Sequence, residues 1–363
     1  MRYQYSLKKF STRIITIIVL AVLIFLLFLL ASYPQLVERY YSEGLYPVIC
    51  KILHPVLNLF PFSVGDVLYI AVTCYLVYAV IIFIRLLFKK EFKSVLILVC
   101  EIVIQIQAAL LIFYLFWGMN YFRPSAGERL NLRDTNYTTS HLANVTCMLI
   151  DSANACRARI TGTDTLQSNK TIYQTAIKAI AVLSADSADF RTYYPGIKSS
   201  LLTPVLNYVG TSGYYNPFTT EAQLNYQMPY FERADIACHE MSHQMGYGPE
   251  DEANFVGFLA GIGSKDRLLR YSAYQMAVDE CMHALRYRDT TLNNELKTHI
   301  SAPVRHDFKV QRAYWLAYRG KMELFSSIFY NNFLKVNNQP HGLDTYNQMV
   351  LLVMAWYGDN SKR

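Results

Sequence analysis

The residues with the clearest chemical meaning lie between positions 237 and 246. They include the pattern H-E-x-x-H, formed by His239, Glu240 and His243. On a helix, side chains four positions apart lie one above the other on the same face. Two imidazoles in this arrangement can bind one Zn²⁺, and the glutamate beside them can serve as a general base. The pattern therefore predicts a zinc site that activates water for hydrolysis.

A zinc site of this kind needs a third protein ligand, and a catalytic site keeps the fourth position open for water. The metzincin pattern would place that ligand at position 249, but Pro249 cannot bind a metal. Three acids follow it, Glu250, Asp251 and Glu252. Glu252 shares a helix face with apolar residues, where a carboxylate is costly unless it is paired or bound to metal. We therefore predict that Glu252 is the third ligand. The other two acids are expected to interact with the positive end of the helix dipole, and this interaction is also the alternative role for Glu252.

Local signals place the motif on a helix that a second helix follows closely. No proline or glycine interrupts residues 231–245, and Gly246 and Gly248 then provide stop signals. Pro249 suits the first turn of the next helix. Upstream, residues 213–225 mix aromatic and β-forming residues around a proline, which predicts an extended segment or hairpin with an edge strand. Such a strand can bind a peptide backbone by β-addition, and a purely structural hairpin is the alternative.

The remainder of the C-terminal part has the patterns of a mainly helical (α+β) domain. Residues 190–212 contain prolines and glycines and are expected to be irregular. The apolar periodicity predicts helices at about 139–159, 171–186, 266–287, 303–334 and 343–357.

Three apolar stretches near the N-terminus are long enough to cross a membrane. The chain has 363 residues, of which 53% are hydrophobic, and this excess is concentrated near the N-terminus. Residues 14–31 form an unbroken apolar run that fits a spanning helix better than a signal peptide. Further spans are expected at about 67–88 and 95–117. We therefore expect a membrane region over residues 1–120 and a water-soluble domain over residues 121–363.

The positive charges around these spans predict the orientation. Four Lys or Arg residues precede or begin the first span, and four more lie between the second and third spans. The loop between the first and second spans has only Arg39 and Lys51. The positive-inside rule places the N-terminus in the cytoplasm, and three spans then carry the C-terminal domain to the other side of the bilayer.

Other features exclude some functions. The net charge of +7 is explained by the residues that set the topology, and the soluble part has no basic stripe with interleaved aromatics, so no nucleic-acid partner is expected. The seven cysteines include no C-x-x-C pair, and Cys238 is expected in the core. Glu101, Gln105 and Ala109 form a stripe on the third span that is expected to contact another helix.

The motif and its surroundings resemble a known class of peptidase. H-E-x-x-H, then Gly246, then E-x-E-A-N-F at residues 250–255 resemble the gluzincin-like peptidases, in which a glutamate of an E-A-N/D turn is the third ligand. With three spans and the segment G-Y-Y-N-P-F-T-T-E-A at residues 213–222, the whole chain resembles an uncharacterised, Bacteroidetes-type family of membrane-anchored zinc-peptidase-like proteins, known as a domain of unknown function.

This resemblance implies a zincin-like domain with one Zn²⁺ held by His239, His243 and Glu252, and with Glu240 as the catalytic residue. It also implies a multi-pass protein of the bacterial inner membrane whose domain faces the periplasm. The expected activity is hydrolysis of a peptide or protein substrate. The alternative is a non-catalytic, zinc-stabilised binding or scaffold protein of the cell envelope, which a blocked fourth zinc position would favour.

Peptide hydrolysis needs two further kinds of residue. The oxyanion formed in the reaction requires a hydrogen-bond donor, for which Tyr230, His341 and Tyr346 are candidates. Asp235 lies one turn before His239 and can orient its imidazole, with helix capping as the alternative. An intramembrane protease is not expected, because His239 lies in a polar segment far from any span.

Overall fold

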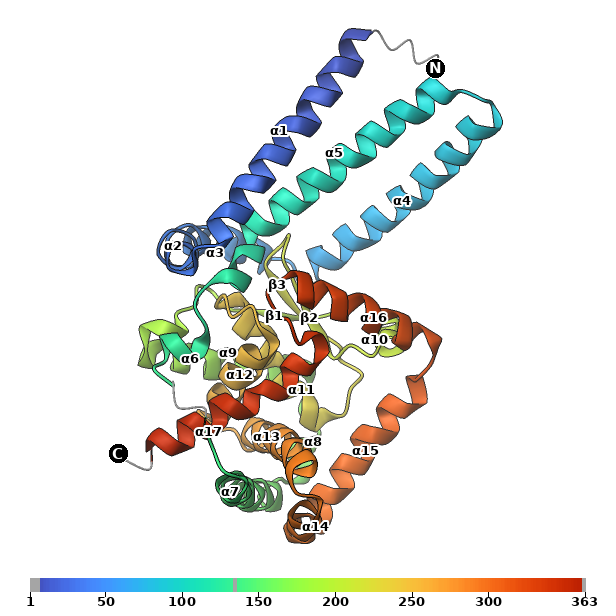
Figure 1. The fold of residues 1–363 in the computed structure, drawn as a ribbon. Helices are drawn as coiled ribbons and strands as arrows, with labels where there is room; N and C mark the ends of the chain where they lie inside the picture. Colours follow the sequence, from blue (N-terminus) through green and yellow to red (C-terminus); the bar gives the residue numbers. More distant parts are fainter. Residues whose placement is uncertain (1–6, 133–135, 361–363) are drawn as a thin grey trace.

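The computed structural model describes residues 7–132 and 136–360, and it is mainly helical with one small sheet (Figure 1). Three long helices stand out from one side of a larger helical body, and the sheet lies in that body close to their bases. This arrangement confirms the predicted combination of three apolar N-terminal helices with a mainly helical part and a small sheet.

The three protruding helices are α1 (Leu7–Ala31), α4 (Val64–Phe88) and α5 (Phe92–Phe116). Each contains a stretch of 22 or 25 residues that is long and apolar enough to cross a membrane, so the three predicted stretches are helices and candidate spans. Many of their large apolar side chains are exposed, as expected where lipid is the solvent. The turn between α4 and α5 lies at the same far end as the beginning of α1 (Figure 1).

Polar side chains join the spans to one another. Arg13 of α1 donates to the carboxylate of Glu101 on α5 at 2.6 Å. Gln105, one turn further along α5, exchanges hydrogen bonds with the Tyr75 hydroxyl of α4. An ionisable group in a membrane helix is costly unless it has a partner. These bonds confirm the prediction that Glu101 and Gln105 mediate contact between helices.

Short elements next to the spans belong to the helical body. They are α2 (Pro34–Leu36), the π-helical η1 (Val37–Leu45), α3 (Tyr46–Leu57) and η2 (Gly118–Phe122). Tyr41, Tyr46, Trp117 and Tyr121 form a buried aromatic cluster that also contains Tyr215 of the sheet. Residues on both sides of position 120 therefore contribute to one packed core.

The base of α4 is fastened to the body by two buried acids. The carboxylate of Glu221 accepts hydrogen bonds from the amides of Val64 and Gly65, at the positive end of the helix dipole. Asp66 in turn accepts a bond from the amide of Leu201 at 2.6 Å. These bonds fix the position of α4 relative to the sheet.

The sheet contains β1 (Ile197–Ser199), β2 (Gly213–Asn216) and β3 (Glu221–Leu224). The strand order is β1-β3-β2, with β1 parallel and β2 antiparallel to β3. Asn216 starts the turn between β2 and β3, and its side-chain oxygen accepts bonds from the amides of Phe218 and Thr219. The predicted hairpin at residues 213–225 is confirmed, and β2 is an outer strand as expected.

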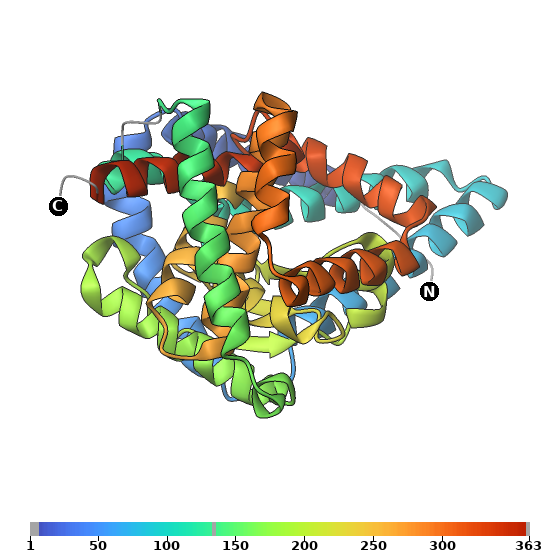
Figure 2. The ribbon, with the colours of Figure 1, turned by 90° about the horizontal axis from the view of Figure 1, so that it is seen from below.

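The remaining helices surround the sheet and one another. α7 and α14 lie side by side at the end farthest from the spans, as the view from that end also shows (Figure 2). The elements are α6 (Ala126–Arg129), α7 (Thr139–Ala158), α8 (Gly162–Thr165), α9 (Asn169–Asp186), η3 (Ala188–Phe190), α10 (Thr203–Val209), α11 (Tyr230–Gln244), α12 (Glu250–Gly263), α13 (Arg267–Arg288), α14 (Thr290–His299), α15 (Ala302–Tyr318), α16 (Lys321–Val336), η4 (Gly342–Gln348) and α17 (Met349–Asn360).

Three sequence-based boundaries need correction. The helix predicted at 303–334 is two helices, α15 and α16, because Gly320 is fully extended (φ −173°, ψ −169°) and interrupts the helix. The helix predicted at 343–357 begins as the 3-10 helix η4 and becomes α-helical only in α17. The segment 190–212, expected to be irregular, contains β1 and α10.

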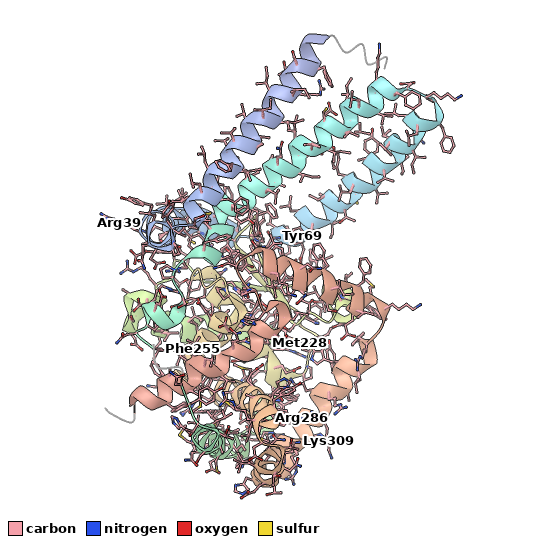
Figure 3. All side chains as sticks on the ribbon, viewed as in Figure 1. Arg39, Tyr69, Met228, Phe255, Arg286 and Lys309 are labelled. Atoms are coloured by element: carbon pink, nitrogen blue, oxygen red, sulfur yellow. The ribbon has the colours of Figure 1, made fainter. Side chains whose placement is uncertain are left out.

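The two helices of the motif region, α11 and α12, lie in the middle of the body. Phe255 of α12 and Met228, just before α11, are fully buried, whereas Arg286 and Lys309 lie at the edge far from the spans (Figure 3). α11 contacts α9, α12, α13 and the sheet, so it is covered on most of its faces. This surrounding core holds the histidines of α11 in a fixed position.

Candidate metal centre and active site

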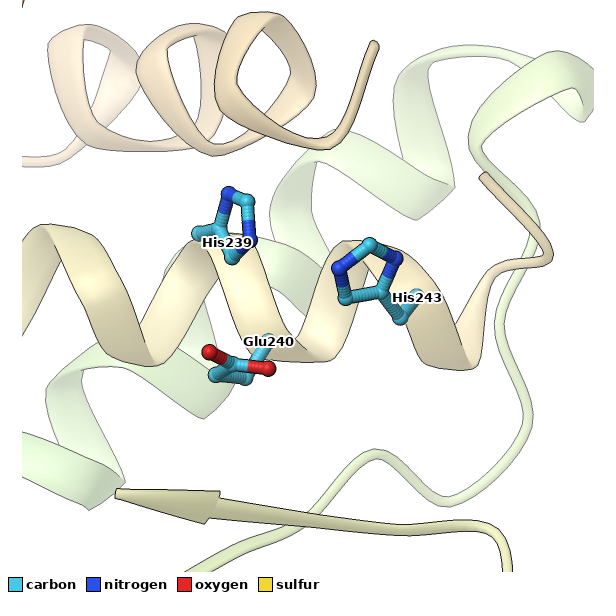
Figure 4. A group of neighbouring side chains, drawn as sticks. All are labelled: His239, Glu240 and His243. Carbon is cyan, nitrogen blue, oxygen red and sulfur yellow. The ribbon is translucent and has the colours of Figure 1, made fainter. Parts of the chain in front are cut away.

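His239, Glu240 and His243 project from one stretch of α11 (Figure 4). Their ligand atoms lie within 4.8 Å of one another, and all three residues are buried. The helical spacing thus brings the motif residues together as predicted. Burial matters here because polar groups held away from water require partners, and a metal ion is one such partner.

The carboxylate that meets both imidazoles belongs to Glu250, the first residue of α12. Its Oε2 atom lies 3.2 Å from Nε2 of His239 and 3.5 Å from Nε2 of His243. Ligand atoms on a tetrahedron with bonds of about 2.0–2.1 Å are separated by about 3.3–3.4 Å. Oε2 of Glu250 therefore lies at about the separation from each Nε2 atom that two ligands of one zinc ion have.

The carboxylate that lies close to both imidazoles is thus that of Glu250 and not that of Glu252, which the sequence analysis chose as the third ligand. Glu252 is buried, but its carboxylate accepts a 2.7 Å bond from the amide of Ala126 and pairs with Arg129 at 3.2 Å. On a helix, positions 250 and 252 point about 200° apart, so both cannot face the imidazoles. The apolar face of α12 correctly indicated that Glu252 needs a partner, but that partner is Arg129.

The turn after α11 orients His243. Its Nδ1 lies 2.7 Å from the carbonyl oxygen of Tyr247, so the Nδ1 proton is donated there and Nε2 is left without a proton, in the form that can bind a metal. Gly246 makes this possible with a left-handed φ of +83°, and the amide of Tyr247 donates back to the carbonyl of Ser242. The glycine that appeared in the sequence as a stop signal thus also sets the tautomer of a predicted ligand.

Two residues from the first 120 positions of the chain donate hydrogen bonds to carbonyl groups at the C-terminal end of α11. The indole Nε1 of Trp117 donates to the carbonyl of His243 at 2.9 Å, and the hydroxyl of Tyr46 donates to that of Gln244 at 2.9 Å. Carbonyls in the last turn of a helix have no partner within the helix, so they need such donors. The Trp117 ring also meets the His243 imidazole edge-on, with centroids 5.7 Å apart.

Two residues far along the chain hold Glu250. The Tyr330 hydroxyl of α16 donates to Oε1 of Glu250 at 2.5 Å, and the side-chain oxygen of Gln339 accepts from its amide at 3.2 Å. Although burial opposes ionisation, the nearby imidazoles of His243 and His239 hold the pKa of Glu250 well below its usual range. Sequence reasoning missed Tyr330 and Gln339, because no local pattern relates them to a motif some 80 residues away.

Glu240 lies beside the outer strand β2. A Cβ atom added to Gly213 of that strand would lie 2.6 Å from Oε1 of Glu240 and 2.7 Å from the carbonyl oxygen of Gln223. Only glycine therefore allows this close approach. Burial raises the pKa of Glu240 to about 7, against the opposing effect of the two imidazoles. A carboxyl group with this pKa can accept and release a proton near neutral pH.

A cavity of about 1280 Å³, called here the central cleft, contains these groups. His239, Glu240, His243 and Glu250 all line it, together with the β2 residues from Gly213 to Tyr215. The four polar side chains converge in a cleft with a largely apolar wall, which is typical of binding sites for small molecules and peptide segments.

The other predicted site residues have different outcomes. Asp235 is buried one turn before His239 and lines the cleft, and it is not a helix cap because α11 begins at Tyr230. Neither Tyr230 nor His341 lines the cleft, so these two are not oxyanion donors in this structure. The side chain of Tyr346 lies outside the part of the chain that the structure describes. Cys238 is fully buried in the core, as predicted.

The chain is thus a helical protein with three candidate membrane spans and a buried His-Glu-His cluster at a large cleft. The sequence model of the family described as "Protein of unknown function (DUF3810)" matches residues 41–354, and the chain belongs to this family. The match includes α4, α5 and the whole cluster, and it confirms the expected membership of a domain-of-unknown-function family. Neither the curated proteins nor the solved structures contain a chain that matches this one.

Proposed function

We propose that this protein is a membrane-anchored, zinc-dependent peptidase. One observation carries the proposal: a single carboxylate oxygen, Oε2 of Glu250, lies 3.2 and 3.5 Å from the Nε2 atoms of His239 and His243. Two imidazoles and one carboxylate are the donors of many catalytic zinc sites, and imidazole favours Zn²⁺ over Mg²⁺ or Ca²⁺. His239, His243 and Glu250 would hold the ion and leave a fourth position towards the cleft.

Zinc bound there would lower the pKa of a water ligand and polarise the scissile carbonyl. The chain's own contribution is the proton transfer. Glu240 would take the proton of the attacking water onto its carboxylate and then donate it to the nitrogen of the leaving amine. The raised pKa of Glu240 supports this role, because the group can then change protonation state near neutral pH.

The position of β2 supports a peptide as substrate. β2 is an outer strand, and among the described residues only β3 pairs with it. It also lines the cleft next to Glu240. An extended peptide that paired with the outer edge of β2 would bring its backbone past the catalytic residues.

We also propose that this is a bacterial inner-membrane protein and that its C-terminal domain faces the periplasm. The beginning of α1 and the α4–α5 turn lie together at the far end of the spans, and the body lies at the other end (Figure 1). Lys8, Lys9 and Arg13 on α1 and four basic residues around the α4–α5 turn (Arg85, Lys89, Lys90 and Lys93) lie towards the far end, which the positive-inside rule assigns to the cytoplasm. Reporter fusions after residue 363 test this: a periplasmic reporter should be active and a cytoplasmic reporter inactive.

The peptidase proposal is tested on the full-length protein in lipid nanodiscs. Zinc content is measured by mass spectrometry, and hydrolysis is followed with a library of fluorogenic peptides. We expect one zinc per chain in the wild type and in Glu240→Gln, and loss of zinc in Glu250→Gln. The exchange Glu295→Gln, at an exposed carboxylate on α14, is the matched control.

The activity measurements separate the two candidate functions. Glu240→Gln should lower kcat by about 10²–10⁴-fold while zinc is retained, since one general base contributes about that much. Equal rates in the wild type and Glu240→Gln would contradict the role of Glu240. Zinc binding without cleavage of any peptide would favour the alternative of a zinc-stabilised scaffold protein.

A further inference from the structure

The central cleft extends from the predicted metal site to the membrane spans. Its membrane side is lined by Ile106, Ala109, Leu110 and Phe113 of α5 and by Tyr69 of α4. Tyr69 lies at the base of α4, where this helix meets the body (Figure 3). One continuous cavity therefore joins the catalytic groups to side chains of two transmembrane helices.

This apolar arm of the cleft reaches far into the bilayer. Ile106 lies ten residues before Phe116, the end of α5, which corresponds to about 15 Å along the helix axis. The hydrocarbon core of a bilayer is about 30 Å thick, so in a bilayer whose core begins at the end of α5 the arm would extend to about the middle. Ile106 and Leu110 remain 55% and 42% exposed, so the arm is open to the lipid.

Hydrogen bonds at its two ends define the lateral opening. The bond between Tyr75 and Gln105 joins α4 to α5 just beyond the level of Ile106. Towards the body, α4 and α5 diverge (Figure 1), and the bonds of Asp66 and Glu221 hold the base of α4 against the sheet. The opening is thus bounded by contacts at both ends, with α4 joined to α5 at one end and to the sheet at the other.

Helix α16 forms a further wall at the membrane surface. It crosses the body close to the base of α4 (Figure 1), and it carries Leu324, Phe325 and Phe329, which are 63%, 80% and 70% exposed. Such an apolar face next to membrane spans is suited to lie in the interfacial region of the bilayer. Phe329 and Tyr330 of the same helix line the cleft, and Tyr330 contacts Glu250.

We propose that the substrate is a membrane-anchored polypeptide, which enters sideways between α4 and α5 and is cleaved just outside the bilayer. This inference rests on the proposed peptidase function and adds the class of substrate. The apolar arm suits a membrane-inserted segment, and the outer strand β2 suits the extended backbone that follows it. A free lipid would fill the arm but would offer no backbone groups to β2, so a polypeptide fits both parts of the cleft.

The first experiment measures entry without relying on catalysis. Full-length Glu240→Gln protein in nanodiscs carries a photo-crosslinking residue in place of Leu110, or in place of Val99 as control. Val99 is a lipid-exposed residue on α5 that does not line the cleft. The probe is a polypeptide with one apolar span of about 20 residues and a hydrophilic extension. We expect at least fivefold more crosslinking from position 110 than from position 99, and we expect the crosslink to lie in the apolar span of the probe. This result would indicate specific entry into the cleft rather than random collision in the bilayer.

The second experiment compares cleavage of the anchored probe with that of its hydrophilic extension alone. The ratio of the two kcat/KM values should be at least about tenfold in favour of the anchored probe. Ala109→Trp, which fills the arm, should lower this ratio about tenfold or more, whereas Val99→Trp should leave it unchanged. Zinc content is measured in each variant and identifies any that has lost its fold.

The outcomes separate the two proposals. Equal crosslinking from positions 110 and 99, or equal cleavage of the anchored and soluble probes, would overturn lateral entry. Crosslinks from position 110 to phospholipid alone would overturn it in favour of a lipid ligand. Specific crosslinking from position 110 without cleavage of any probe would support lateral entry and reject the peptidase function.

Discussion

Exchanging Glu250 and Glu252 one at a time for glutamine should give opposite results, although the two acids are only two positions apart. Glu252 forms an ion pair with Arg129, and the two side chains are only 6% and 7% exposed. In Glu252→Gln the guanidinium is left buried without its counter-charge, which costs about 3–5 kcal/mol. The melting temperature should therefore fall by about 10 °C.

Glu250→Gln should change the response to zinc instead. Its side-chain oxygen can still accept the bond from Tyr330, so the metal-free protein should lose less stability than Glu252→Gln does. In the wild type, free zinc at about 1,000 times its Kd should stabilise the fold by about 4 kcal/mol. We expect this increment to persist in Glu252→Gln and to disappear in Glu250→Gln.

The assay is thermal unfolding of the full-length protein in nanodiscs, with a chelator and then with zinc. Glu295→Gln should match the wild type in both conditions. If Glu252→Gln loses the zinc increment while Glu250→Gln keeps it, the ligand assignment from the structure is wrong and the sequence-based choice is right. If neither exchange alters the increment, zinc binds elsewhere.

Three further predictions follow from other contacts. Gly213→Ala should lower kcat at least tenfold with zinc retained, because its Cβ would displace Glu240; unchanged kcat would show that β2 can move away. Burial, followed by the charge of Asp279, raises the pKa of Glu280 to about 8, so the native state loses stability as the pH rises from about 4.5 through 8. Glu280→Gln should therefore raise the melting temperature at pH 8.5 and leave it nearly unchanged at pH 4, and an equal shift at both values would contradict this. Arg13→Leu should destabilise the protein in detergent, and adding Glu101→Leu should restore part of the loss, as a coupled pair requires.

Local patterns were sufficient for much of the fold. Continuous apolar runs predicted the three spans, since a bilayer demands about 20 apolar residues in a row. The spacing of His239 and His243 predicted one shared face, because a helix fixes that relation regardless of its surroundings. The hairpin at 213–225 followed from β-forming residues around a turn. In each case the controlling interaction lies within a few residues along the chain.

Which acid of α12 faces the imidazoles depends on information that lies elsewhere in the chain. The choice between Glu250 and Glu252 depends on the rotation of α12 about its axis, and Arg129, Tyr330 and Gln339 determine that rotation through contacts more than 75 residues away in the chain. The break between α15 and α16 was missed for a related reason. Gly320 alone is tolerated within many helices, and the turn there accompanies the packing of α16 against α10 and η4, which the local sequence does not reveal.

The bonds from Trp117 and Tyr46 to the last carbonyls of α11 have a consequence for biosynthesis. Both donors are translated before α11 and lie beside spans, so the end of α11 can receive these two bonds only when those spans have taken their places. A fragment that starts at residue 121 lacks both donors and would leave these carbonyls without partners. The end of α11 is thereby coupled to the placement of the spans, and a chain whose spans are not in place would lack two hydrogen bonds on the helix that carries His239 and His243.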